Sequence, residues 1–403
     1  MSPLSPIQTP EPTPVQRPQA VRLPLDPLLT LAVLGLGVFS IVTLRAATRN
    51  LIPSNPHYYV DHQVIYLIVG LVFMLGLSRV DYARLRRLRN PVYAILLLSI
   101  LAVIALGHTA RGSQRAINFP FFSFQASELG KVLMILFLAA FVVDRSRRLR
   151  ERDTTVRVML LAIGPALLVI LEPDLGSGMV YLVIAFVLLL VAGAPFKHLG
   201  ALIALAVVSI TLVLSVAPAA GVHLLKPYQV DRLTAFLHPS NDSQKEGYQQ
   251  QESKIAIGSG QKTGRGVNAT QTTLKFVPEG HTDFIFAAVG EQYGFVGAAL
   301  LLSLYALLIW RTLRILTMAK DLFGSLVAGG VAAMVMFQVF VNVGMAIGIM
   351  PITGVTLPLM SYGGSSVVTT LLAVGLLQSI YVQARASDAW KGRVPLTPDR
   401  VRY

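Results

Sequence analysis

Long apolar runs alternate with short polar segments over most of the chain. Ten of these runs have cores that approach transmembrane length. In chain order the cores are 28–44, 63–77, 91–106, 129–143, 158–171, 175–191, 199–217, 284–310, 322–349 and 366–381. A helix needs about 20 residues to cross the hydrocarbon core, so the shorter runs must extend into flanking polar residues. The pattern predicts an all-α polytopic membrane protein with about ten transmembrane helices.

Composition supports this prediction, because 54% of the 403 residues are hydrophobic and only 13% are charged. A soluble globular protein is excluded by that balance. The net charge of +14 would suit a nucleic acid, but arginines concentrate in two turns, 79–89 and 144–157. In a ten-helix arrangement both turns lie on the side of both termini. The positive-inside rule then places both termini in the cytoplasm, and the basic residues face anionic lipid rather than nucleic acid.

The ends of the chain differ from its middle. Residues 1–24 are rich in proline and lack an apolar core, so we expect a disordered cytoplasmic arm rather than a cleavable signal peptide. Residues 25–386 form the expected membrane domain, and 387–403 a basic cytoplasmic tail. The chain has no cysteine, which rules out disulfides within it.

Two short segments place ionisable residues at the extracytoplasmic ends of helices. Segment 111–131 has an aromatic group typical of an interfacial or re-entrant element. Behind it, Glu128 and Lys131 lie three residues apart at the start of a helix, where unpaired charges near hydrocarbon cost several kcal/mol. In EPDLGSG, 172–178, Asp174 either caps the next helix or points into an outer vestibule, and spacing does not separate the two.

The largest extracytoplasmic segment, 218–283, separates the seventh and eighth predicted helices and is long enough to form an ordered binding surface. It contains GSGQKTGRG, where glycines flank Lys262 and Arg265. This stretch is either a diphosphate-binding loop or a flexible solvated one. It is not a Walker motif. Further on, GIMPITGVTLPLMSYGGSS, 348–366, is typical of a broken or re-entrant element that lines a cavity.

The stretch FVPEGHTDFIFAAVGEQYGFVG, 276–297, brings polar residues to the start of an apolar run. Asp283 precedes that run directly, so it is either an N-cap or a carboxylate that works at the membrane surface. A carboxylate in such a position could act as a general base.

These motifs, together with GYQQQESKIAIGSG and QASELGK, resemble the SEDS family (shape, elongation, division and sporulation) in order over residues 25–385. Within it, YQVDRLTAFLHP and FVNVGMAIGIMP are more similar to the elongation branch, RodA, than to the division branch, FtsW. The chain departs from the usual family pattern at Ala116, Ala126, Glu172 and Gln292, where the family usually has Trp, Pro, Gln and Glu.

The resemblance implies a peptidoglycan glycosyltransferase that polymerises lipid II outside the cytoplasmic membrane, during elongation. It implies that the enzyme works with a class B penicillin-binding protein and other membrane proteins of the elongation complex. Asp283 would be the essential carboxylate, Glu128 and Lys131 a catalytic pair, and Arg115 and Asp174 part of the same cavity. The expected substrate-binding residues are Arg115, Asp174, Lys262, Arg265, Gln271, Lys275 and His281.

Chemistry of the residues supports this function and leaves alternatives open. Arg115, Lys131 and Arg265 could stabilise a departing diphosphate, alone or with a divalent cation such as Mg²⁺ or Mn²⁺, although we predict no protein metal site. One carboxylate opposite cations suits a single inverting displacement. A flippase for a lipid-linked precursor would need ionisable residues near the bilayer midplane, and a non-catalytic scaffold for a transpeptidase would need no carboxylate.

Overall fold

The computed structural model describes residues 25–110, 113–119, 122–216, 246–272 and 276–391, together with Val230, Arg232 and Phe236. The arm predicted for 1–24 lies outside these residues. The last helix runs to Lys391, so the first residues of the predicted tail 387–403 continue that helix, and the rest of the tail lies outside the described part.

Each of the ten predicted apolar cores coincides with a helix. They are α1 (Pro27–Ala47), α2 (Tyr58–Ser78), α4 (Arg89–Leu106), α5 (Ala126–Asp144), α6 (Arg152–Leu171), α7 (Leu175–Val191), α8 (Phe196–Thr211), α12 (Ile285–Met318), α13 (Leu322–Ile347) and α14 (Gly364–Lys391). Among the described residues, nine helices are long and apolar enough to cross a membrane, and α7 is a shorter apolar helix of 17 residues. The prediction of a helical polytopic membrane protein is confirmed.

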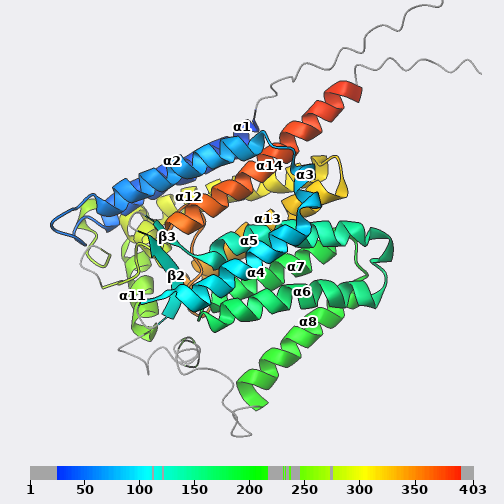
Figure 1. Ribbon diagram of the computed structural model, residues 1–403. Coiled ribbons are helices and arrows are strands. Elements are labelled where there is room, and N and C mark those ends of the chain that lie inside the picture. Colours follow the sequence, from blue (N-terminus) through cyan, green and yellow to red (C-terminus); the bar gives the residue numbers. More distant parts are fainter. Residues whose placement is uncertain are drawn as a thin grey trace, which may run out of the picture.

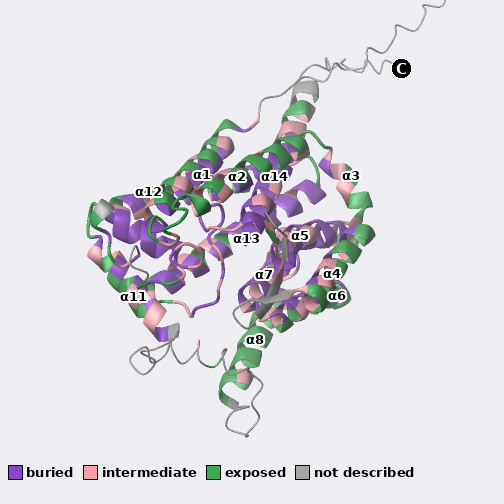
Figure 2. Cartoon of the chain, turned by 60° about the vertical axis from the view of Figure 1, so that its left-hand side comes forward, coloured by how far each residue is buried: buried purple, intermediate pink, exposed green. Residues whose placement is uncertain are grey.

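Consecutive long helices run in opposite directions and form one bundle (Figure 1). Helices α5, α7 and α13 lie in its interior and are largely buried, whereas α8 stands at the edge with most of its residues exposed (Figure 2). Exposed apolar residues on the outer helices suit contact with lipid chains, because hydrocarbon is as apolar as these side chains.

Both described ends of the chain lie at the same end of the bundle, which we call the terminal end (Figure 1). There the buried carboxylate of Asp26 accepts a hydrogen bond from Arg311 Nε at 3.1 Å and is also paired with that guanidinium's Nη2. Gln378 Oε1 accepts the Asp26 N–H at 2.8 Å. These contacts join α1, α12 and α14. The opposite end is called the distal end below.

Short elements occupy the connections. They are α3 (Tyr82–Arg87), η1 (Ser146–Arg148), the π-helix η2 (Leu212–Val216), α11 (Glu246–Ser259) and η3 (Gly266–Asn268). An antiparallel sheet of order β1-β2-β3 precedes α5, with β1 (His108–Ala110), β2 (Ser113–Phe119) and β3 (Phe122–Phe124). The segment predicted as interfacial is therefore a small sheet at the distal end, a local departure from the all-α prediction. Its aromatic and β-branched residues favour strands.

The eighth predicted run, 284–310, is not one straight helix. Gly294 has φ 62° and ψ −156°, which breaks α12 into two helices. The loop after α11 fills the break, because Gln261 O accepts from Phe295 N at 2.9 Å and Lys262 O accepts from Val296 N at 3.1 Å. A Cβ on Gly264 would lie 2.1 Å from Gln292 O. Two glycines of this contact therefore allow backbones to touch.

Helix α11 packs across the distal end of α13. Gln250 Nε2 donates to Met345 O at 3.2 Å, and Ser253 Oγ donates to Ala346 O at 2.8 Å. The last carbonyls of a helix have no partner within it, so these side chains satisfy groups that would otherwise be unpaired in an apolar setting. Part of the predicted segment 218–283 is thus ordered against the bundle.

Candidate functional site

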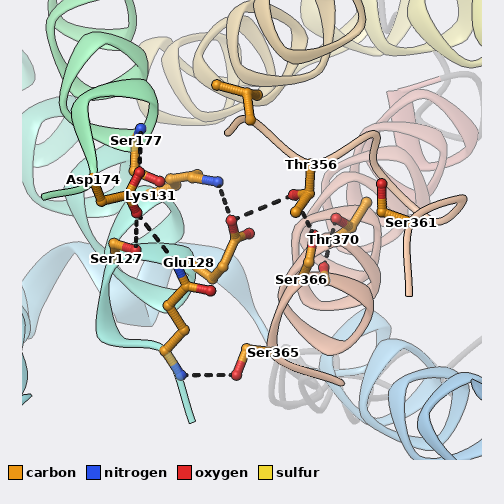
Figure 3. A network of polar contacts seen from close by, with 12 residues as sticks. Ser127, Glu128, Lys131, Asp174, Ser177, Thr356, Ser361, Ser365, Ser366 and Thr370 are labelled. Carbon is orange, nitrogen blue, oxygen red and sulfur yellow. Dashed lines mark hydrogen bonds and ion pairs between the residues drawn. The ribbon is translucent and has the colours of Figure 1, made fainter. Parts of the chain in front are cut away.

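A buried polar network lies at the distal end, where α5 and α7 meet the segment 348–363 that precedes α14 (Figure 3). It consists of Ser127, Glu128, Lys131, Asp174, Ser177, Thr356 and Ser366. Most residues of 352–362 are buried although this segment has no regular structure. An irregular segment here agrees with the broken element that the sequence predicts for 348–366, and such backbone is tolerated in a membrane protein where protein encloses it.

Glu128 and Lys131 form the predicted pair on the first two turns of α5. Lys131 Nζ lies 2.6 Å from Glu128 Oε1, and the two side chains are 2% and 5% exposed. Thr356 Oγ1 lies 3.5 Å from the same Glu128 oxygen, and Ser366 Oγ lies 3.0 Å from Thr356 Oγ1. The carboxylate also faces the positive end of the α5 dipole. The pair thus links α5 to the 348–363 segment and to α14.

Asp174 is buried and caps α7, which is one of the two roles that the sequence left open. As the N-cap of α7 it accepts the Ser177 N–H at 3.1 Å. Its other oxygen accepts from Ser127 Oγ at 2.8 Å and from Gln125 Nε2 at 3.2 Å. Three donors from α5, α7 and the residue before α5 therefore hold this carboxylate in one position.

Glu172, in the turn between α6 and α7, has a different environment. It is 3% exposed, and neither carboxyl oxygen is hydrogen-bonded to any residue that the structure describes. Burial, with the nearby charge of Asp174, raises the pKa of Glu172 to about 8. The group is therefore mostly a neutral carboxylic acid at pH 7. Glu172, where the family usually has Gln, therefore adds little negative charge next to Asp174 at that pH.

Asp283 lies on the loop that enters α12 and is partly exposed. The N-cap of α12 is Phe284, with no side-chain cap, so the helix-cap interpretation of Asp283 is not what the structure shows. Asn342 Nδ2 donates to Asp283 O at 2.8 Å and to Val355 O at 2.7 Å. Since Val355 precedes Thr356, this amide joins the Asp283 loop to the buried polar network.

A second contact holds the same loop. Ser361 Oγ donates to Thr282 O at 2.7 Å and accepts from Leu357 N at 2.8 Å. Thr282 Oγ1 in turn donates to Glu279 Oε2 at 2.8 Å. The structure therefore brings together three of the predicted features: the Asp283 loop, the Glu128–Lys131 pair and the 348–366 segment.

Other predicted substrate-binding residues lie elsewhere at the distal end or outside the described side chains. Lys262 and Arg265 are exposed, and Arg265 Nε donates to Ser259 O at 3.2 Å. The His281 ring lies 4.9 Å from that of Tyr59. Arg115 belongs to β2, but its side chain is not among those described. Lys275 lies outside the described residues.

Glu291 was not among the predicted site residues. It is fully buried within α12, and its carboxylate accepts from Gln271 N at 2.8 Å, Thr272 N at 2.8 Å and Thr272 Oγ1 at 2.7 Å. This carboxylate fixes the end of the loop that follows α11. An acidic residue inside an apolar run is the sequence signal that could have identified it, because such residues are costly unless partnered.

Metal ligands of the usual kind do not gather at the site. Within the described residues, no group of three or more His, Cys, Asp or Glu side chains is placed to hold a metal ion.

Residues 25–386 match the model of the family described as "Cell cycle protein", FTSW_RODA_SPOVE. The chain is 37% identical over 381 residues to a probable peptidoglycan glycosyltransferase FtsW of Thioalkalivibrio sulfidiphilus, covering 91% of each chain. It is 34% identical over 362 residues to peptidoglycan glycosyltransferase MrdB of Escherichia coli, covering 90% of this chain and 94% of that one.

Two solved structures of related proteins are similar to this fold over most of the chain. One from a study of how a peptidoglycan synthase complex coordinates polymerisation and crosslinking has a TM-score of 0.75 at 31% identity, over 90% of this chain and 99% of that one. The rod shape determining protein RodA of Thermus thermophilus has a TM-score of 0.65 at 28% identity, over 90% and 98%. Relatives of several names match over similar lengths, so the similarity identifies the family rather than one branch. The chain belongs to the FtsW, RodA and SpoVE family of polytopic membrane proteins.

Proposed function

We propose that this protein is a peptidoglycan glycosyltransferase that polymerises lipid II into glycan strands. The observation that carries the proposal is the tie between the partly exposed Asp283 and the buried Glu128–Lys131 pair, through Asn342 and the Val355–Thr356 backbone. The names of the matched relatives support the same activity. A carboxylate fixed at the edge of a bundle is suited to a substrate whose sugar is in water and whose tail is in lipid.

Asp283 acts as the general base. The acceptor sugar's 4-hydroxyl gives its proton to the Asp283 carboxylate as its oxygen attacks the anomeric carbon of the donor. The bond from that carbon to the diphosphate oxygen breaks, and the lipid diphosphate leaves with the electron pair. A positioned base typically contributes about 10²–10⁴-fold to such a rate.

Glu128 and Lys131 support this reaction without contacting the substrate. Their side chains are at most 5% exposed, so we assign them to holding the 348–363 segment in place rather than to contact with the sugar. Lys131 also adds a cation to the electrostatic field of a site from which water is largely excluded, where charge acts over longer distances. The exposed Arg265, with Arg115 and Lys262, is placed in this proposal as a contact for the diphosphate.

The proposed location is the cytoplasmic membrane, with the distal end outward. The arginine-rich turns at the terminal end support this orientation through the positive-inside rule. The proposed partners are a class B penicillin-binding protein and elongation-complex membrane proteins. The structural similarity to a chain from a synthase complex supports the first of these. The motifs shared with RodA support a role in elongation.

The test is polymerisation of purified lipid II by the purified protein, alone and with its class B penicillin-binding protein. We expect long glycan strands resolved by electrophoresis, with more polymer when the partner is present. Lipid II that crosses a liposome bilayer without becoming longer would refute the proposal in favour of a flippase.

A further inference from the structure

A second group of side chains adjoins Asp283 at the distal end. Its rings come from the start of α2, from the loop before α12 and from the segment before α14. This aromatic cluster consists of Tyr58, Tyr59, His62, Tyr66, His281 and Tyr362. The proposed reaction uses none of these residues, and only His281 is among the substrate-binding residues expected from the sequence.

The rings form a continuous set. The Tyr59 ring centroid lies 4.9 Å from His281 and 4.9 Å from Tyr362, in edge-to-face arrangements. The Tyr58 ring lies 4.2 Å from that of His62. Such pairs contribute beyond the area that they bury, so the three chain segments hold one another in register.

Backbone contacts fix the cluster beside the proposed base. Tyr362 N donates to His281 O at 2.9 Å, and Asp283 follows His281 by two residues. The hydrogen bond from Ser361 to Thr282 O spans the same short stretch. These two hydrogen bonds hold the backbone at Ser361 and Tyr362 next to the backbone at His281 and Thr282, directly before Asp283.

The cluster differs from an ordinary band of interfacial aromatic residues. Tyr66 is only 8% exposed, Tyr58 at the rim is 38% exposed, and Tyr59 and Tyr362 are intermediate. Burial, with the neighbouring phenol of Tyr66, raises the pKa of Tyr362, so its hydroxyl stays neutral and can both donate and accept. The cluster therefore places aromatic rings and tyrosine hydroxyls near Asp283, and their exposure ranges from buried to exposed.

We propose that the aromatic cluster is a binding subsite for the pyranose rings of the acceptor, the sugar whose hydroxyl Asp283 deprotonates. The C–H groups on a pyranose face are weakly positive and pack against the negative face of an aromatic ring, while tyrosine hydroxyls bond the sugar hydroxyls. This assignment rests on the proposed function, because it takes Asp283 as the base. It adds a location for the acceptor on this chain, and Tyr59 is the ring to test because it contacts both His281 and Tyr362.

The first experiment measures binding without turnover. Saturation-transfer NMR would use a β-1,4-linked N-acetylglucosamine tetramer as the probe and the full-length protein in nanodiscs. We expect saturation of the sugar ring protons with wild type and with Tyr59→Phe, and a loss of most of it with Tyr59→Ala. Phe295→Ala is the matched control, since Phe295 is 72% exposed at the same end but outside the cluster.

The second experiment measures polymerisation kinetics for the same variants. Removing one stacking ring should raise KM for lipid II by roughly 10-fold while kcat changes less, because the lost contact serves binding. Phe295→Ala should leave KM within about twofold of wild type, as a residue outside the subsite would.

Three results would overturn the subsite. The first is a tetramer signal in Tyr59→Ala that equals that of wild type, and the second is an equal loss of that signal in Phe295→Ala. The third is a Tyr59→Ala variant that no longer binds a polyprenyl diphosphate probe but keeps the tetramer signal. The last would assign the rings to the lipid chain. Because the tetramer needs no turnover, its binding stands or fails separately from the glycosyltransferase activity.

Discussion

Replacing Lys131 by Met should destabilise the bundle strongly. The substitution removes the ammonium 2.6 Å from Glu128 Oε1 and leaves a carboxylate that is 5% exposed. Its remaining neighbour is Thr356 Oγ1 at 3.5 Å, a long contact for a hydrogen bond. Breaking a buried pair by removing one partner typically costs about 3–5 kcal/mol, since one charge remains uncompensated. We expect a loss of that size in the free energy of unfolding.

The double variant provides the decisive comparison. Glu128→Gln combined with Lys131→Met removes both charges, and buried pairs replaced in this way are often close to neutral in stability. We therefore expect the double variant to be more stable than Lys131→Met alone, by about 2 kcal/mol or more. We expect its polymerisation rate to stay below that of wild type, because the contact that holds the 348–363 segment and the charge of Lys131 are both lost.

Steric trapping in bicelles would give the free energies of unfolding for wild type, both single variants and the double variant. Leu98→Met, at a residue 64% exposed on α4, is a control for substitution in a membrane helix. Losses below about 1 kcal/mol in both single variants would refute the reasoning, because that is the range of exposed pairs.

Three further predictions concern other parts of the fold. Burial raises the pKa of Glu172 from 4.5 to about 8, so wild type should lose stability relative to Glu172→Gln as pH rises from about 4.5 to about 8, by at most roughly 5 kcal/mol. Melting curves across that range check this, and a difference independent of pH would contradict it. Gly264→Ala, at φ +85°, should cost about 1–3 kcal/mol for the backbone alone, seen as a lower melting temperature, whereas an unchanged melting temperature would mean that the loop is not docked on α12. Arg311→Met should cost about 3–5 kcal/mol by leaving Asp26 buried without its cation, and adding Asp26→Asn should recover part of the loss. No recovery in that double variant would argue against a paired charge.

The membrane architecture could be predicted from sequence because every spanning backbone must satisfy its own hydrogen bonds, so apolar runs of sufficient length become helices. The Glu128–Lys131 pair could also be predicted, because a spacing of three residues places both side chains on one face of a helix. Asp174 was identified, and the sequence could not show that its two oxygens serve the cap and the network separately.

Other features depend on contacts between distant segments. The break at Gly294 interrupts a run predicted as one helix, at the place where the loop at Gly264 docks. Asp283 was singled out by its position before an apolar run. Its link to Thr356 passes through Asn342 of α13, which lies 59 residues further along the chain than Asp283. Contacts of this kind are set by tertiary structure, so no local pattern reports them.

The role of Asp283 is the central claim, and single-turnover polymerisation tests it most directly. Wild type, Asp283→Asn and Asp283→Glu would be compared at matched melting temperature and saturating lipid II. Loss of a general base should lower the rate of Asp283→Asn by about 10²-fold or more, and Asp283→Glu should retain part of the activity. A rate for Asp283→Asn within about threefold of wild type would show that another group accepts the proton, and would contradict the account.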